Sequence, residues 1–245
     1  MAEVLFYVSA FFAEVTGTVA GFGSSTILLP IALFFFDLRI ALVLVAFFHL
    51  SGGIGRILFF RRSFDKRLLL IFGAPSVVLT VAGALLVNYL PQSWLKIVLA
   101  VFLIAYAFLS LWKQERWVPA SARNAAVGGG LSGFFAGLIG TGGVLRGAFL
   151  TAFGLEKSVY IATAAVVSVA VDVTRIPVYV ASGFLEPQSY ITVLILAVLA
   201  IPAAFVGNRI VKRIPQSTFR KIVLAAIILV SIKLVYDGFS QVFTG

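Results

Sequence analysis

Apolar runs close to the length of a membrane span recur along the whole chain and limit what it can fold into. We place them at residues 4–36, 40–60, 68–88, 94–112, 126–153, 158–181, 190–208 and 222–237. A helix of about 20 apolar residues crosses the hydrocarbon core of a bilayer. With 61% hydrophobic residues, 11% charged residues and a mean hydropathy of +1.11, the chain does not have the composition of a soluble domain. The sequence predicts an all-α polytopic membrane protein with one transmembrane domain over residues 1–245.

Two of these runs are interrupted by glycines near their middle. Gly21-Phe-Gly-Ser-Ser25 breaks the first run, and Gly140-Thr-Gly-Gly143 breaks the fifth run 119 residues later. A break in a lipid-embedded helix leaves backbone N–H and C=O groups without partners, which is tolerated only where protein or a cavity surrounds them. Paired breaks at matching positions of two halves point to the binding site of a transporter.

The same spacing relates other parts of the two halves. At an offset of 119, Asp37 falls on Glu156 and Arg56 falls on Arg175. At an offset of 124 or 125, Gly83 falls on Gly207, Pro91-Gln-Ser93 on Pro215-Gln-Ser217, and Lys96-Ile-Val-Leu-Ala100 on Lys221-Ile-Val-Leu-Ala225. We therefore predict a duplication, with a first repeat over 1–118 and a second repeat over 119–245.

The distribution of lysine and arginine indicates how the chain crosses the membrane. If all eight runs span, the loops on each side carry eight basic residues. If runs 4–36 and 126–153 enter and return on one side, thirteen basic residues lie inside and three outside, as the positive-inside rule requires. Each half then has a re-entrant or broken hairpin plus three transmembrane helices, and the second repeat is inverted. Two arms of about 15 residues each would bring both glycine turns to the midplane.

The glycine turns are the predicted substrate site. Each second arm starts directly after its glycines, so its free N–H groups and positive dipole end would face the membrane centre and suit an anion. The candidate binding residues in the turns are Gly21, Gly23, Ser24, Ser25, Gly140, Thr141, Gly142 and Gly143, and Thr26 adds a hydroxyl group. The structural alternative is close helix packing by small residues.

Six ionisable residues fall within the predicted spans, where each needs a partner or a water-filled cavity. They are Glu14, His49, Arg56, Arg146, Asp172 and Arg175. A guanidinium group suits oxyanions, so the three arginines are candidate substrate ligands. Inversion would place the equivalent Arg56 and Arg175 at opposite entrances. A local Asp172–Arg175 ion pair and snorkelling of Arg56 are the simpler alternatives.

The same set contains the candidates for proton coupling, which are Glu14, His49 and Asp172. A histidine within a span can relay a proton near neutral pH, although a hydrogen bond between packed helices explains it equally well.

Other residue types exclude several functions. The chain has no cysteine and one histidine, so we expect no disulfide, no histidine-based metal site and no cofactor. The net charge of +10 lies largely in short loops between apolar runs, which argues against a nucleic-acid partner. The sequence has no P-loop, so ATP is not the direct energy source.

The motifs together resemble the sulfite exporter TauE/SafE family of membrane proteins. The resemblance rests on Gly21-Phe-Gly-Ser-Ser-Thr-Ile-Leu-Leu-Pro30, on Leu138-Ile-Gly-Thr-Gly-Gly143, and on the Pro-Gln-Ser turns before the closing helices, and it covers nearly the whole chain. It implies transport of small anions that often contain sulfur, such as sulfite and organosulfonates. The chain departs from the family pattern at Ser24 and Ser25, where glycines are usual, and at Arg146, where many members are apolar.

We therefore expect a secondary transporter that exports its anion and works by alternating access at the repeat interface. An anion channel is the main alternative, and an intramembrane hydrolase with Ser24 or Ser25 as nucleophile and His49 as base is a weaker one. The expected partners are a small anion and the lipid bilayer, with a homodimer left open. The expected location is the bacterial inner membrane.

Overall fold

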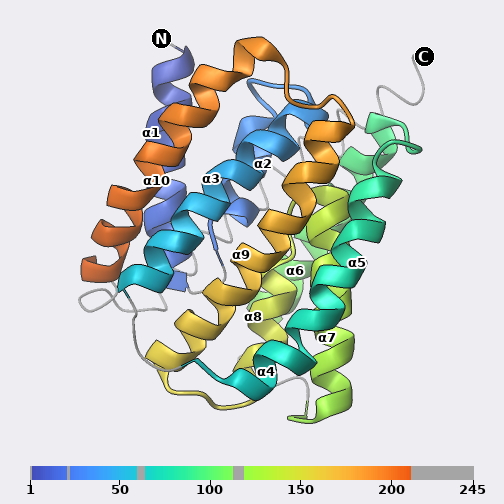
Figure 1. The fold of residues 1–245 in the computed structure, drawn as a ribbon, viewed down its shortest axis with the longest axis vertical. Coiled ribbons are helices and arrows are strands. Elements are labelled where there is room, and N and C mark those ends of the chain that lie inside the picture. Colours follow the sequence, from blue (N-terminus) through green and yellow to red (C-terminus); the bar gives the residue numbers. More distant parts are fainter. Residues whose placement is uncertain (1, 21–22, 60–63, 113–118, 211–245) are drawn as a thin grey trace.

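The computed structural model describes residues 2–20, 23–59, 64–112 and 119–210, and over these residues the chain forms helices joined by short turns (Figure 1). The elements are α1 (Ala2–Ala20), α2 (Ser25–Ala32), α3 (Leu38–Phe59), α4 (Lys66–Ile71), α5 (Gly73–Leu86), α6 (Gln92–Trp112), α7 (Ala122–Ile139), α8 (Gly143–Thr151), α9 (Lys157–Ala181), the 3₁₀ turn η1 (Pro187–Ser189) and α10 (Tyr190–Ile210).

Every predicted apolar run within the described residues forms helix. Within the described part of the chain, four stretches are long and apolar enough to cross a bilayer, namely Leu38–Phe59, Lys66–Leu86, Ser158–Ala181 and Pro187–Ile210. The described residues are thus helical as predicted, and the four stretches are consistent with the predicted membrane protein. The run predicted at 222–237 lies outside the described residues.

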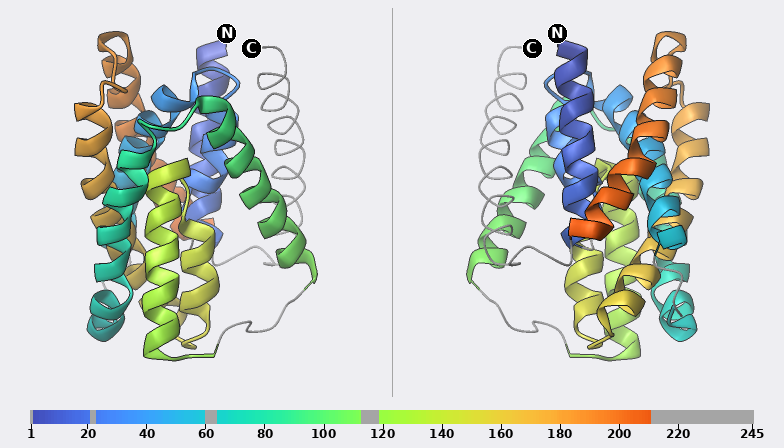
Figure 2. Two further views of the ribbon diagram at one scale, coloured as in Figure 1. Left: turned by 90° about the vertical axis from the view of Figure 1, so that its right-hand side faces the viewer. Right: turned by 90° about the vertical axis from the view of Figure 1, so that its left-hand side faces the viewer.

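The two glycine-broken runs fold as helical hairpins. In Figures 1 and 2, α1 descends from the N-terminal end of the bundle and α2 turns back, whereas α7 rises from the opposite end and α8 returns to it. The arms have 19 and 8 residues in the first hairpin and 18 and 9 in the second. The predicted arms of about 15 residues each are therefore wrong. In both hairpins the second arm ends early, because the N–H groups of Phe34 and Phe35 after α2, and of Ala152 and Phe153 after α8, bond to carbonyls three residues back.

The turns gather at two ends of the bundle. The turns between α2 and α3, α5 and α6, and α9 and α10 lie at the end that holds the N-terminus, and the starts of α4 and α7 and the turn between α8 and α9 lie at the other (Figures 1 and 2). The basic residues Lys66, Arg67 and Arg123 thus belong to the end opposite the N-terminus. These positions agree with the sides that the charge count assigned to the loops.

Helix α3 runs through the core. It packs against α9 and α10, and its residues 41–46 are fully buried. Beside it, α5 and α7 approach so closely that a Cβ added to Gly133 would lie 1.9 Å from the carbonyl oxygen of Ser76. The hydroxyl of Ser76 donates to the carbonyl of Gly129 at 2.8 Å. Small residues in α7 thus let two backbones touch, as membrane helices often do.

Candidate functional site

The first glycine break needs two glycines to let the chain turn back. Gly23 has φ +97°, which favours glycine, and its N–H donates to the carbonyl of Gly17 at 3.3 Å. A Cβ on Gly17 would lie 2.4 Å from the backbone nitrogen of Ser24, so only glycine at position 17 lets the returning backbone pass α1. Ser24 then becomes the N-cap residue of α2, without a side-chain bond to the helix N–H groups.

The buried carboxylate of Glu14 holds this break in place. Its oxygens accept hydrogen bonds from the hydroxyls of Ser24 at 2.5 Å and Thr18 at 3.1 Å, and from Nη1 of Arg56 on α3. The carboxylate occupies the space over Gly52, where an added Cβ would lie 2.4 Å from its Cδ. Glu14 therefore joins α1, α3 and the start of α2 through one fully buried group.

The second break has the same construction with different contacts. Gly140 ends α7 in the left-handed conformation with φ +72°, and Gly142 is the N-cap residue of α8. A Cβ on Gly142 would lie 1.9 Å from the carbonyl oxygen of Ser132, whose hydroxyl donates to the carbonyl of Gly142 at 2.9 Å. The N-terminus of α8, like that of α2, has no side-chain cap.

The two breaks meet. The hydroxyl oxygens of Thr26, in the first turn of α2, and Thr141, between α7 and α8, lie 2.7 Å apart and are both fully buried. A Cβ added to Gly140 would lie 2.6 Å from Leu42 and 3.0 Å from Leu29, so the first half closes directly onto the second break. Segments more than 100 residues apart in the sequence thus share one hydrogen-bonded point.

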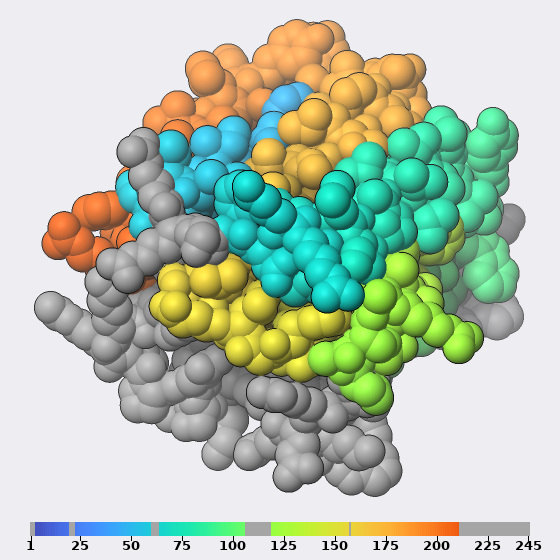
Figure 3. Space-filling model, turned by 60° about the horizontal axis from the view of Figure 1, so that its bottom comes forward, coloured from blue at the N-terminus to red at the C-terminus, as the bar shows by residue number. Residues whose placement is uncertain are grey.

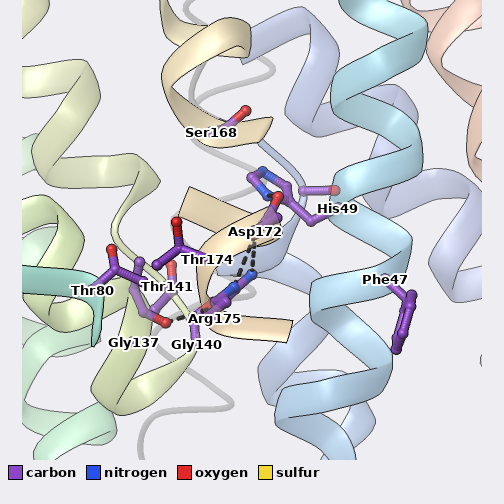
Figure 4. Close-up of polar contacts among 12 residues, drawn as sticks. Phe47, His49, Thr80, Gly137, Gly140, Thr141, Ser168, Asp172, Thr174 and Arg175 are labelled. Atoms are coloured by element: carbon purple, nitrogen blue, oxygen red, sulfur yellow. Dashed lines mark hydrogen bonds and ion pairs between the residues drawn. The ribbon is translucent and has the colours of Figure 1, made fainter. Parts of the chain in front are cut away.

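A second network of polar contacts connects α3 to α7. Nδ1 of His49 lies 2.7 Å from Oδ2 of Asp172, and Oδ1 of Asp172 accepts from Nε of Arg175 at 2.9 Å and lies 2.7 Å from its Nη2. Nη1 of Arg175 donates to the carbonyls of Ala136 and Gly140, both at 2.9 Å. In Figure 4, His49 and Asp172 point toward one another, Arg175 reaches the end of α7, and Phe47 points away.

This network of contacts explains how α7 can end inside the protein. The last carbonyls of a helix have no partner within it and carry the negative end of its dipole. The guanidinium of Arg175 supplies both N–H groups and positive charge at that end. The hydroxyl of Tyr179, four residues further along α9, donates to the carbonyl of Gly137 at 2.5 Å.

The third buried arginine lies on the short arm of the second hairpin. Arg146 is 3% exposed, one turn after Gly142, and interacts electrostatically with Asp172, Arg56 and Arg175. Among the described residues, this region buries three guanidiniums, the two carboxylates of Glu14 and Asp172, the imidazole of His49 and the neutral phenol of Tyr179. Positive charge exceeds negative charge when the histidine is neutral.

Most of the predicted site residues come together in this cluster. Those that the structure places in it are Glu14, Gly23, Ser24, Ser25, His49, Arg56, Gly140, Thr141, Gly142, Gly143, Arg146, Asp172 and Arg175, all of them buried. Gly21 lies outside the described residues. The predicted local pair of Asp172 with Arg175 is present. Arg56 and Arg175 do not lie at exposed entrances, because protein leaves them only 3% and 1% exposed.

Sequence reasoning did not assign several residues that build the cluster. Thr18, Gly52, Ser132 and Tyr179 each bond to or make room for a predicted residue. Helical spacing offered a signal for three of them. Thr18 follows Glu14 by four residues, Tyr179 follows Arg175 by four, and Gly52 precedes Arg56, the partner of Glu14, by four, so each pair shares a helix face.

A cavity of about 280 Å³ lies away from the cluster, at the end of the bundle opposite the N-terminus. It is lined by Asp65, the N-cap residue of α4, by Arg67 in the first turn of α4, by Ser121 and Ala125 at the start of α7, and by Phe153 after α8. Figure 3 shows the face on which these segments come together.

The sulfite exporter TauE/SafE family matches residues 6–234, nearly the whole chain. No curated protein matches the sequence of this chain. Members of this family are membrane transporters of the sulfite exporter type and not enzymes, so the hydrolase alternative is set aside. The hydroxyl of Ser24 accordingly bonds to Glu14, and His49 bonds to Asp172. From its glycine-broken hairpins, its apolar helices and this match, the chain belongs to the sulfite exporter TauE/SafE family.

Proposed function

We propose that this protein is a secondary carrier that exports a small sulfur-containing anion, such as sulfite or an organosulfonate, by alternating access. The anion binds where the two glycine breaks meet. The observation that carries this proposal is the contact of Thr26 with Thr141, which brings the starts of α2 and α8 to one buried point.

The chemistry of this point suits an anion. Helix N-termini present free N–H groups and a partial positive charge, and here two of them lie together without a side-chain cap. The same cluster buries three guanidiniums and only two carboxylates. An anion of one negative charge would neutralise the one excess positive charge. This neutralisation is favourable because an unbalanced charge is costly in a medium that solvates charge poorly.

The arginines have different roles in this proposal. The described N–H bonds of Arg175 go to Asp172 and the end of α7, so we assign it to positioning. Arg146 lies one turn into α8, next to the uncapped N–H groups, and is our primary substrate ligand. Arg56 has a buried Nη2 without a hydrogen-bond partner among the described residues, and this group is available to the same anion.

Matched contacts support an inverted repeat. A Cβ added to Gly83 on α5 would lie 2.2 Å from the carbonyl oxygen of Phe134 on α7. The equivalent Gly207 on α10 meets the carbonyl oxygen of Val15 on α1 at 2.9 Å, and Val15 is equivalent to Phe134 at the 119-residue offset. The opposite directions of the two hairpins agree with this symmetry. Alternating access would then exchange the two halves around a fixed central site.

We place the protein in the bacterial inner membrane, with the end opposite the N-terminus in the cytoplasm. The basic residues of that end support this orientation. The cavity beside Arg67 and Ser121 would then face the cytoplasm and serve as the entry site for an exported anion.

Transport in proteoliposomes tests this function. We expect saturable uptake of labelled sulfite that unlabelled sulfite or methanesulfonate inside the vesicles accelerates. Arg146→Gln should lower the rate at least about tenfold, because one lost charge-assisted contact costs about 1.5–3 kcal/mol. Arg209→Gln is the matched control, since Arg209 is exposed and stacks on Phe205, and it should transport normally.

Three results would contradict the proposal. Flux of neither anion would reject the substrate class. Conductance without acceleration by internal anion would indicate a channel. Equal rates for Arg146→Gln and Arg209→Gln would remove Arg146 from the site.

A further inference from the structure

We propose that His49 couples anion binding to the uptake of one proton at its Nε2 atom, which makes the carrier an anion–proton symporter. This inference rests on the proposed function and names the coupling ion of the same site. It starts from the position of the imidazole between Asp172 and the first glycine break.

Asp172 fixes which ring nitrogen carries the first proton. Oδ1 of Asp172 lies within 3 Å of Nε and Nη2 of Arg175, as an ionised carboxylate would. Oδ2 of an ionised carboxylate can only accept, so Nδ1 of His49, 2.7 Å away, is the donor. In the neutral ring the remaining nitrogen, Nε2, is then an acceptor with a lone pair.

That remaining nitrogen lies at the substrate site. Nε2 is buried and has no hydrogen-bond partner among the described residues. It lies against Gly23, where an added Cβ would be 2.2 Å away. Gly23 precedes the N-cap residue of α2 in the sequence. The atom that can gain or lose a proton therefore sits next to the N–H groups that we assign to the anion.

The two protonation states treat an anion in opposite ways. Neutral His49 presents a lone pair, which repels an oxyanion. Protonated His49 presents an N–H donor and a positive charge, which bind it. The proton adds to Nε2 as the anion arrives and returns to water as the anion leaves, so one proton accompanies each anion.

The charges around His49 explain why the proton and the anion need each other. Asp172, which Arg175 also binds, faces it from α9, Arg56 acts on it from its own helix and Arg146 from α8. Glu14 on α1 is engaged by Arg56. Because positive charge is already in excess, protonation of His49 is unfavourable until an anion is present. By reciprocity, the proton raises anion affinity by the same factor that the anion raises proton affinity.

Binding of methanesulfonate at different pH values tests the inference, because the charge of this anion does not change with pH. We expect the affinity of the purified protein to fall about tenfold per pH unit as pH rises through part of the range from about pH 5 to about pH 8. Calorimetry in two buffers of different ionisation enthalpy should detect about one proton taken up per anion.

Two variants separate His49 from other groups. His49→Gln keeps a polar side chain that does not titrate, so its affinity should be independent of pH. Thr174→Val is the control, because Thr174 bonds only to the carbonyl of Ala170 on its own helix among the contacts described, and it should keep the wild-type slope.

The outcomes distinguish this inference from the proposed function. Methanesulfonate binding that is independent of pH and takes up no proton would overturn the coupling and leave the anion carrier intact. A slope that persists in His49→Gln would also overturn it. Absence of binding at every pH, for sulfite as well, would overturn both.

Discussion

Gly23 meets two requirements at one backbone position. Its φ of +97° is unfavourable for a residue with a side chain, and its missing Cβ leaves room for the ring of His49. Gly183, in the turn after α9, has φ +76° but open space around it. The two glycines therefore separate the cost of the backbone conformation from the cost of the contact.

We predict that Gly183→Ala destabilises the protein by about 1–2 kcal/mol and transports anion normally. Gly23→Ala should lose as much stability and also most of its transport, because the new Cβ displaces the imidazole from Asp172. Thermal unfolding in detergent and counterflow in proteoliposomes measure the two effects. Equal transport by both variants would show that contact between Gly23 and His49 is not needed.

At the scale of elements, the close approach of α5 and α7 is the feature most sensitive to a single methyl group. Gly133 faces the backbone of Ser76, and backbone atoms cannot move aside as side-chain ends can. Gly73, at the start of α5, meets only Val167 at an ordinary 3.7 Å. Both glycines are helical, so alanine gains about the same helix propensity at each position.

We expect Gly133→Ala to lower the melting temperature strongly, through overpacking of at least about 1–3 kcal/mol. Gly73→Ala should leave it unchanged or raise it, since the propensity gain of up to about 1 kcal/mol meets no clash. Thermal unfolding of both variants in the same detergent makes the comparison. A stable Gly133→Ala protein would mean that α5 and α7 do not pack this closely.

The elements were predictable because their signals are local. Hydrophobic run length gave the helices, and the glycine pairs gave the breaks at Gly23 and Gly140. The Asp172–Arg175 pair followed from three-residue spacing. The lengths of the hairpin arms were not predictable in the same way, because α2 ends through backbone bonds at Phe34 and Phe35 that no residue type signals.

At the scale of the whole molecule, the contacts that join the halves were beyond the sequence. Glu14 pairs with Arg56 across 42 positions, and His49 with Asp172 across 123. A helical period shows which residues share a face but not which faces meet. The repeat identified equivalent positions, yet Glu14 and Asp172 are not equivalent, so symmetry alone could not predict either pair.

The inverted arrangement predicts opposite accessibility for the first arms of the two hairpins. The chain has no cysteine, so single cysteines can be introduced at the exposed Glu3, near the start of α1, and Arg123, at the start of α7. In right-side-out vesicles, an impermeant maleimide should label Glu3→Cys at once and Arg123→Cys only after permeabilisation. Labelling of both from the same side would contradict an inverted repeat.

The central claim is that the two glycine breaks meet at the site through which the anion passes. It is tested most directly by joining Thr26→Cys to Thr141→Cys with a disulfide. The wild-type hydroxyl oxygens are 2.7 Å apart, close to the about 2.05 Å of an S–S bond. We predict that oxidation links the pair and stops transport, that reduction restores it, and that neither single variant responds. Two results would contradict this claim: cysteines that do not form the disulfide, or a disulfide-linked protein that transports as fast as the same protein after reduction.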